Sequence, residues 1–298
     1  DFRMTISTCG CKGIRFCAAC EHTERVQKLK FEEKEHEGFS CFIWDGKRNV
    51  AIVSPHLNPD SSIEDIQKAS TSIIGDEECM EIDGLLLIND FISKEEEDYL
   101  MERIDRVEWA LSQSGRRKQD YGPQVNFKHK KVKTTKFVGM PDYADMLLDK
   151  MSNYDEKRLG EYIPFEMCNL EYEESRKSAI EMHQDDMWIW GNRLISINLI
   201  NGSVMTMSNE KEKQLLFVWM PHLSLLCMAD TSRYSWKHGV LPHHIKGRRI
   251  ALTMREAATA FQPGGDLYEK YGKGLIDISR IRVPLGEENK PSDTVCGC

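Results

Sequence analysis

The sequence lacks a long apolar run. None of its hydrophobic stretches approaches the roughly 20 consecutive residues that a helix needs to cross a lipid bilayer, although 40% of the 298 residues are hydrophobic. It also lacks an excess of basic charge, because 48 acidic residues outnumber 40 basic ones and leave a net charge of −8. We therefore exclude a membrane-spanning protein and a protein drawn to nucleic acid by its overall charge.

The cysteines lack the even spread of a disulfide framework. Four of the ten, Cys9, Cys11, Cys17 and Cys20, crowd the start of the chain, and two more stand at its end. Four thiolates at this spacing suffice for a tetrahedral zinc site, and free thiols in a flexible tail are the alternative. The pattern favours metal binding in a reducing compartment over secretion.

Changes in composition divide the chain into four parts, and no internal repeat is present. We predict a Cys-rich segment over 1–25 and a polar linker over 26–81, with one short hairpin near 39–53. A compact domain follows over 82–265, and a C-terminal tail over 266–298 ends the chain.

Within the compact domain, helical patterns come first and strand patterns follow. Ser93 and Glu96 form a capping box, which predicts a helix over 93–104, and a second helix is predicted over 141–151 with Asp142 as its cap. After residue 160, short apolar runs alternate with polar turns, as in a sandwich or jelly roll of antiparallel sheets. The predicted fold class is α+β with a mainly β core and flanking helices.

The stretch EMHQDDMWIWG, residues 181–191, places His183 two residues before Asp185. On an extended segment these side chains project to the same side and converge on one point. A metal needs a third ligand, for which the candidates are His222, His238, His243 and His244. His238 is preferred because it follows a predicted strand. Two histidines and one carboxylate leave three coordination positions open, which favours Fe(II) and oxygen chemistry; the alternative is a surface turn.

The residues next to this motif are predicted to be structural. If Asp185 points at the metal, Asp186 faces away and orients a neighbour or caps the turn. Trp188 and Trp190 are predicted to pack in the core behind the motif rather than to stack on a substrate.

The strand RIALTMR has one charged and one apolar face. Arg249 and Arg255 lie on the same face, about 20 Å apart at ~3.3 Å per residue. If this face points into a small barrel, its arginines need anionic partners, because an unpaired buried charge is costly. A dicarboxylate with one end on the metal and the other on an arginine meets that need. A solvent-facing edge strand is the alternative.

A basic segment spans Gly115 to Lys136, where eight Lys or Arg residues accompany one acid, Asp120. Basic side chains interleaved with aromatic ones grip nucleic acid or an acidic protein surface, and a solvated loop is the alternative. The candidate substrate-binding residues are Arg116, Arg117, Lys118 and Tyr121.

Together these motifs resemble the AlkB family of Fe(II)/2-oxoglutarate dioxygenases. The resemblance rests on His183-x-Asp185, the downstream His238 and Arg249-x5-Arg255. The strings CNLEY, WKHGV and TMREAATAFQPGG, together with the N-terminal CGCKGIRFCAAC, look like one branch of it, the alkB homologue 4 proteins. The resemblance covers roughly residues 82–265 and the cysteine segment.

The resemblance implies a double-stranded β-helix, a jelly-roll or cupin-like fold, that holds Fe(II) through His183, Asp185 and His238. It implies that 2-oxoglutarate chelates the iron and pairs with Arg249, with Arg255 near the other carboxylate or Asp185. With O2, such enzymes oxidise a methyl group on nitrogen to a hydroxymethyl group, which leaves as formaldehyde. The iron performs this chemistry, and the protein binds, orients and excludes water.

One part of the sequence departs from the family pattern. AlkB relatives present Asn-x-Tyr to the cosubstrate, whereas this chain has Asn169-Leu170-Glu171-Tyr172. Asn169 and Tyr172 cannot both point inward on a regular strand, although a bulge would bring them together. We favour Tyr172 as the residue that contacts 2-oxoglutarate.

The resemblance implies two substrates, monomethyl-lysine in actin, with regulation of actomyosin, and N6-methyladenine in DNA. We favour the methylated protein, because only one segment is basic and the net charge is negative. We expect a monomer in the cytoplasm and nucleus. A non-catalytic adaptor that binds actomyosin or chromatin partners is the hypothesis from another class; the intact metal motif and both arginines argue against it.

Overall fold

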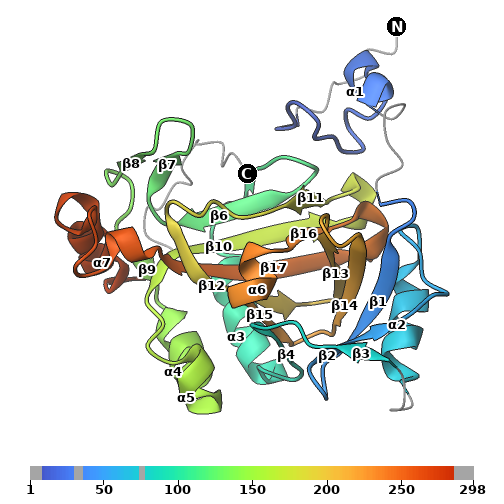
Figure 1. Cartoon of the computed structure of the whole chain (residues 1–298). Coiled ribbons are helices and arrows are strands. Elements are labelled where there is room, and N and C mark those ends of the chain that lie inside the picture. Colours follow the sequence, from blue (N-terminus) through green and yellow to red (C-terminus); the bar gives the residue numbers. More distant parts are fainter. Residues whose placement is uncertain (1–8, 30–35, 74–77, 285–298) are drawn as a thin grey trace, which may run out of the picture.

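Two seven-stranded sheets form the body of the protein (Figure 1). A computed structural model describes residues 9–29, 36–73 and 78–284. The first sheet contains, in spatial order, β11 (Ile180–His183), β16 (Lys237–Val240), β13 (Ser203–Asn209), β14 (Gln214–Met220), β1 (Ser40–Asp45), β2 (Val50–Val53) and β3 (Cys79–Met80). The second contains β4 (Leu85–Ile88), β15 (Leu225–Met228), β12 (Trp190–Leu199), β17 (Arg248–Ala257), β10 (Pro164–Glu173), β6 (Arg117–Tyr121) and β5 (Ala110–Leu111).

Smaller elements surround the sheets. The two-stranded pairs are β7 (Gln124–Asn126) with β8 (Lys131–Lys133), and β9 (Met140–Pro141) with β18 (Arg282–Val283). The α-helices are α1 (Glu24–Leu29), α2 (Ile63–Thr71), α3 (Lys94–Ile104), α4 (Ala144–Tyr154), α5 (Glu156–Leu159), α6 (Asp230–Tyr234) and α7 (Lys273–Ser279). None of these described helices is both long and apolar enough to cross a membrane.

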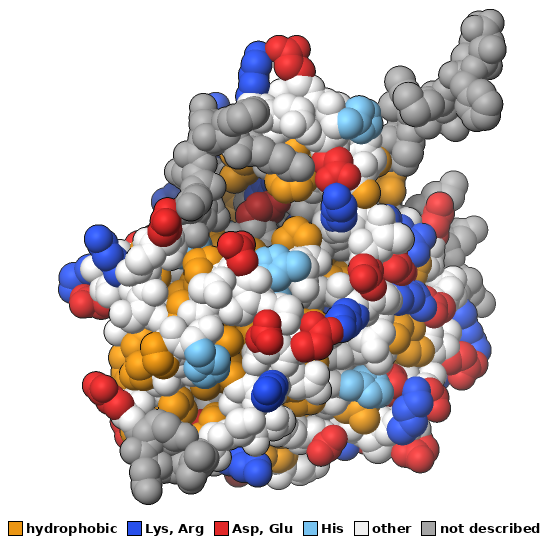
Figure 2. Space-filling view, turned by 90° about the vertical axis from the view of Figure 1, so that its right-hand side faces the viewer, with side chains coloured by type: hydrophobic (Ala, Val, Ile, Leu, Met, Phe, Trp, Pro, Cys, Tyr) orange, Lys and Arg blue, Asp and Glu red, His pale blue; other side chains and the backbone are white. Residues whose placement is uncertain are grey.

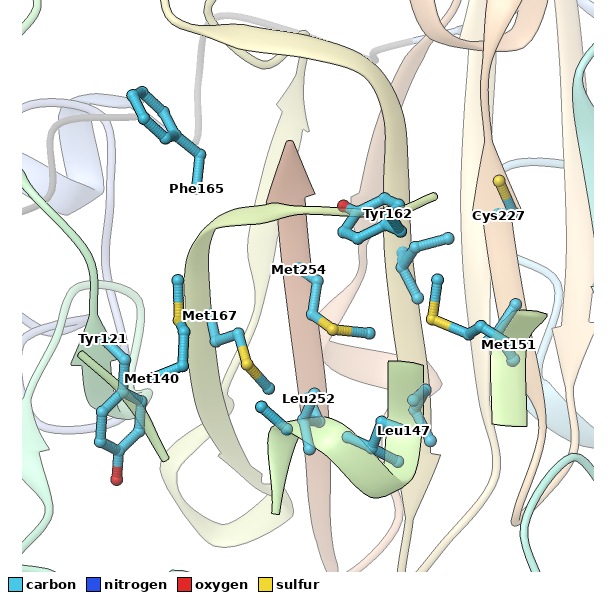
Figure 3. Close-up of a cluster of buried hydrophobic side chains, with 14 of the residues drawn as sticks. Tyr121, Met140, Leu147, Met151, Tyr162, Phe165, Met167, Cys227, Leu252 and Met254 are labelled. Atoms are coloured by element: carbon cyan, nitrogen blue, oxygen red, sulfur yellow. The ribbon is translucent and has the colours of Figure 1, made fainter. Parts of the chain in front are cut away.

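The core has an inner and an outer layer. Between the sheets, side chains of both pack together, for example Trp44 and Val218 of the first sheet with Leu170 and Leu226 of the second. On the outer face of the second sheet, β17 and β10 pack against α4 through a methionine-rich cluster that Figure 3 shows. Closing one sheet over the other creates a dry interior, which is where the charged face of β17 points.

The predicted fold class is confirmed: the chain forms a mainly β core, a double-stranded β-helix, with flanking helices. The capping box is also confirmed, since the Ser93 side chain accepts from Glu96 N and the Glu96 side chain accepts from Ser93 N. The prediction for Asp142 is wrong, because α4 begins at Ala144 without a side-chain cap. Asp142 Oδ1 lies 3.5 Å from Arg103 Nε instead.

The segment predicted to be a linker differs most from expectation. The expected hairpin exists as β1 and β2, but β1 also pairs in parallel with β14 and becomes an inner strand of the first sheet. Phe42 faces the space between the sheets and Ile43 faces α2. A strand that is buried on both faces shows a short apolar run instead of alternating apolar and polar residues. The partner strand β14 is also distant in sequence, so the local sequence pattern does not reveal that β1 is an inner strand.

The predicted C-terminal tail is also partly folded. A π-helix (Tyr268–Gly272) and α7 follow residue 265, and Phe261 and Leu275 are buried in the outer core layer. β18 then pairs in parallel with β9. The terminal Cys296 and Cys298 lie outside the described residues.

We expect Ile43→Ala to lower the free energy of unfolding by about 2–5 kcal/mol, because it removes buried methyl groups and leaves a cavity. Ile43 is 1% exposed. The matched control is Ser40→Ala on the same strand, where the side chain is exposed, and it should change stability by less than about 0.5 kcal/mol. Chemical denaturation measures both. Equal small effects would mean that this segment is a linker after all.

Candidate metal centre

The edge of the first sheet brings the two histidines together. β11 pairs with β16 so that His183 lies opposite His238, and their ring centroids are 4.4 Å apart. Asp185 follows the end of β11, and its Oδ2 lies 3.7 Å from His238 Nε2. The three side chains offer ligand atoms that all lie within 4.8 Å of one another. The tertiary structure thus assembles a two-histidine, one-carboxylate set from segments more than fifty residues apart.

The chemical state of this set suits a divalent metal. His183 Nδ1 lies 2.7 Å from the Glu181 carbonyl oxygen, so this nitrogen carries the proton and donates, which leaves Nε2 bare. Nε2 is buried and has no hydrogen-bond partner among the described residues. Burial lowers the pKa of His183 and, with the neighbouring His183 ring, lowers the pKa of His238 to about 3. Both imidazoles are therefore neutral and able to ligate Fe(II).

A half-buried arginine of β17 holds the carboxylate ligand. Arg255 Nη2 lies 2.8 Å from Asp185 Oδ1, and Nη1 donates to Glu166 Oε2. Burial alone raises the pKa of a carboxyl, yet the Arg255 guanidinium lowers the pKa of Asp185 below its usual value. Asp185 therefore stays ionised. Of the two expected positions for Arg255, this structure shows the one beside Asp185.

A second arginine fixes the backbone of the metal-binding turn. Arg233 of α6 is buried, and it donates through Nη1 to the Asp185 carbonyl oxygen at 3.0 Å and through Nη2 to the Asp186 carbonyl oxygen at 3.1 Å. No motif singles out Arg233 in the sequence; its only signal is its position five residues before His238. Outer-shell contacts of this kind orient metal ligands, so we classify Arg233 as a positioning residue.

The expected structural roles next to the motif are confirmed. Asp186 Oδ1 accepts from Trp188 N at 2.8 Å and from Ile189 N at 3.2 Å, so Asp186 caps the turn. Trp190 is buried and Trp188 packs against the same core. These contacts fix the conformation of the turn that follows Asp185.

Arg249 is an unsatisfied cation inside the protein. It lies on an inner strand and is 1% exposed, which rules out the solvent-facing edge strand. Its Nε donates to Asn198 Oδ1 at 2.5 Å, but Nη1 and Nη2 have no hydrogen-bond partner among the described residues. Leaving buried donors unpaired is costly, and a carboxylate accepts both of them bidentately. Arg249 is thus suited to bind the carboxylate of a small ligand.

The structure separates Tyr172 from Asn169. Tyr172 pairs with Arg249 across the two strands, and the Arg249 guanidinium carbon lies 4.9 Å from its ring centroid. Asn169 belongs to the opposite face of β10, where its Nδ2 donates to Gln119 Oε1 at 2.9 Å. The bulge in β10 lies near its start and does not realign the two residues. Asn169 therefore does not share the side of Arg249, whereas Tyr172 does.

The four candidate substrate-binding residues do not form one surface, because β6 is a strand of the second sheet. Arg116 and Lys118 are buried; Arg116 lies 5.9 Å from the Tyr172 ring, and Lys118 pairs with Asp120. Arg117 points to the other face and pairs with Glu171, with Nη2 to Oε1 at 2.8 Å.

The placement of Tyr121 contradicts its expected role. Its ring is buried in the outer core layer, in the cluster of Figure 3 that also contains Met140 and Met167. The density of basic residues predicted one binding surface, and only the sheet reveals that alternate side chains of β6 point in opposite directions.

Comparisons with known proteins agree with this geometry. Residues 84–255, which include the three metal-ligand candidates as well as Arg249 and Arg255, match the 2OG-Fe(II) oxygenase superfamily. The chain is 67% identical over 281 residues to the DNA N6-methyl adenine demethylase of Caenorhabditis elegans, covering 94% of this chain and 97% of the relative. It is 34% identical to the alpha-ketoglutarate-dependent dioxygenase alkB homolog 4 of Homo sapiens, covering 95% of each chain.

We expect Arg249→Lys to weaken 2-oxoglutarate binding about 10- to 100-fold, because a charge-assisted pair of hydrogen bonds contributes about 1.5–3 kcal/mol and an ammonium cannot reproduce the fork. Anaerobic calorimetric titration of the iron-loaded protein measures this. The control is Arg248→Lys, because Arg248 is adjacent to Arg249 but points away from it and pairs with Asp105. Equal affinity in both variants would remove Arg249 from the site.

We expect Arg233→Lys to lower the affinity for Fe(II) about 10- to 100-fold, as losses of outer-shell contacts do, while the fold persists. Arg193→Lys is the matched control, because Arg193 of β12 also donates to two backbone carbonyls, but these belong to Arg158 and Gly160 at the end of α5. Competition with an iron chelator gives both affinities. An unchanged affinity in Arg233→Lys would show that the turn needs no such support.

Proposed function

The chain belongs to the 2OG-Fe(II) oxygenase superfamily, and on this premise we propose that it oxidatively removes the methyl group from N6-methyladenine in DNA. The observation that carries the proposal is the 67% identity, over nearly the whole of both chains, to a relative named for that reaction. The human relative at 34% identity bears a name that specifies no substrate. The comparisons thus favour the DNA alternative over the methyl-lysine substrate that the overall charge favoured.

His183, Asp185 and His238 would hold the iron, and the fit rests on the orphaned His183 Nε2 and the neutral imidazoles. When bound, Fe(II) with 2-oxoglutarate and O2 supplies the oxidation, in which one oxygen atom enters the N-methyl group while 2-oxoglutarate becomes succinate and CO2. The resulting hydroxymethylamine breaks its C–N bond and releases formaldehyde and the free amine.

The remaining residues bind, orient and exclude water. Arg249 beside Tyr172 would pair with the 2-oxoglutarate carboxylate that is remote from the iron, because no described residue hydrogen-bonds its two terminal nitrogens. Arg255 and Arg233 hold Asp185 and its turn in place. The apolar side chains between the sheets keep solvent away from the reacting methyl group.

A basic hairpin supports a polyanionic substrate. The residues from 122 to 136 include no acid, and the exposed lysines there are Lys128, Lys130, Lys131, Lys133 and Lys136. In Figure 1 this β7–β8 hairpin projects on the side away from β1 and α2. Figure 2 shows the β1 and α2 side, where acidic and basic side chains are interspersed. The hairpin is thus a local concentration of positive charge on an acidic protein, suited to phosphate contacts.

The substrate is tested by incubating the iron-loaded protein with 2-oxoglutarate and one of two substrates. These are an N6-methyladenine oligonucleotide and a monomethyl-lysine actin peptide, with a no-substrate sample beside them. We expect formaldehyde with the oligonucleotide only, and none in His183→Ala. Release with the peptide only would transfer the proposal to the protein substrate. No release from a protein shown to bind iron and 2-oxoglutarate would favour the non-catalytic adaptor.

We expect replacing Lys130, Lys131 and Lys133 by serine to weaken oligonucleotide binding and to reduce the slope of log affinity against log salt by about one per lost phosphate contact. Replacing Lys47, Lys68 and Lys211 by serine removes the same charge from exposed positions on the other side. That control should leave the slope unchanged. Equal slopes for both triple variants would contradict a role of the hairpin in DNA binding.

A further inference from the structure

The four N-terminal cysteines converge on one point. The sulfurs of Cys9, Cys11, Cys17 and Cys20 all lie within 4.8 Å of one another, and those of Cys17 and Cys20 are 3.9 Å apart. A tetrahedral Zn–thiolate centre with bonds of about 2.3 Å places its sulfurs about 3.8 Å apart. A disulfide needs sulfurs about 2.05 Å apart, and all four cysteines are unpaired. The spacing therefore fits one metal ion among four sulfurs.

The surroundings of these sulfurs suit thiolates. The backbone N–H groups of Gly115 and Ser114 point at the Cys11 sulfur. Arg25 Nη2 lies 3.6 Å from the Cys20 sulfur. N–H donors and a guanidinium directed at sulfur stabilise the negative charge of a metal-bound thiolate. Four neutral thiols without a cation would gain little from these donors.

The number and type of ligands point to zinc. Four thiolates in a tetrahedron are typical of Zn²⁺ or of iron–sulfur clusters. A cluster contains several metal atoms and spreads its cysteines apart, whereas these four sulfurs are gathered as closely as around a single ion. The absence of an open ligand position makes such a site structural rather than catalytic.

The cysteine cluster is docked on the oxygenase core. Ala18 N donates to the Arg176 carbonyl oxygen at 3.1 Å, and Arg15 Nη1 donates to Gln113 Oε1 at 2.9 Å. A Cβ on Gly10 would approach Ser112 O to 2.7 Å, and one on Gly115 would approach the Cys17 Cβ to 3.2 Å. A side chain at either position would block the close approach of the two segments. The contact between the cysteine segment and the core therefore depends on these two glycines.

This docking reaches the strand that carries a metal ligand. Arg15 Nε lies 3.4 Å from Glu181 Oε2, and the same carboxylate accepts a hydrogen bond from Ser114 Oγ. The carbonyl of Glu181 in turn accepts from His183 Nδ1. The docked loop also leads directly into Arg116, beside Tyr172. The ion pair between Arg15 and Glu181 thus connects the cysteine segment to β11, and the Glu181 carbonyl connects it to His183 in the metal centre.

We infer that Cys9, Cys11, Cys17 and Cys20 bind one structural Zn²⁺, which clamps the N-terminal segment onto the loop 112–116 and β11 and so steadies His183. The site lies outside the matched oxygenase region, residues 84–255. The inference does not depend on which substrate the enzyme demethylates.

The metal is tested in the His183→Ala background, so that zinc does not enter the iron site. Elemental analysis of the purified chain should find one zinc per chain, and adding Cys17→Ser should abolish it. Cys79→Ser is the control, because Cys79 is an exposed free thiol outside the cluster. Iron with acid-labile sulfide instead of zinc, no metal, or zinc retained in Cys17→Ser would each overturn the inference. Circular dichroism verifies that the variants are folded.

The clamp is tested by removing zinc from the otherwise unchanged chain with a thiol reagent and a chelator. Hydrogen exchange should accelerate at residues 112–116 and 180–183 and stay unchanged in the distant α2. Re-adding zinc after thiol regeneration should restore protection. Unchanged exchange at both segments after zinc release would overturn the clamp, and this readout needs no substrate, iron or turnover.

Discussion

The ion pair between Arg255 and Asp185 joins the two halves of the metal centre. Asp185 follows an edge strand of the first sheet, whereas Arg255 belongs to an inner strand of the second. Asp185 is buried and Arg255 is half-buried, so removing Arg255 would leave the Asp185 carboxylate buried without its guanidinium partner, at a cost of about 3–5 kcal/mol. The position of the metal ligands thus depends on the two sheets closing over each other.

The charge balance between the sheets explains why the interior needs a ligand. The cations there are Arg116, Lys118, Arg233, Arg249 and Arg255, and the carboxylates near them are Asp120, Glu166 and Asp185. Three carboxylates leave two of the five positive charges uncompensated, and the terminal nitrogens of Arg249 have no hydrogen-bond partner among the described residues. An iron ion adds two further positive charges, so a dianionic cosubstrate lowers the net positive charge where a neutral one would not. The charges of the interior thus favour a dianion such as 2-oxoglutarate.

Glu181 links two regions that the chain order keeps apart. Its side chain meets Arg15 and Ser114, and its carbonyl fixes the proton position of His183. Changes in the N-terminal segment therefore have a short physical route to the metal ligand, through one residue of β11. Such coupling is expected where a small segment of about twenty residues, too short to bury its own core, packs on a large domain.

The sequence by itself determined the features that local chemistry encodes. The alternation from Arg249 to Arg255 set one charged and one apolar face, the capping box set the start of α3, and His183-x-Asp185 set two ligands. Only the tertiary structure decided the rest, because it depended on partners distant in the chain. Parallel pairing with β14 turned a supposed linker into an inner strand, and sheet pairing sent Tyr121 and Asn169 away from the site. The role of Arg233 became visible only in the structure, because the fold and not a sequence motif places its guanidinium beside the backbone of Asp185.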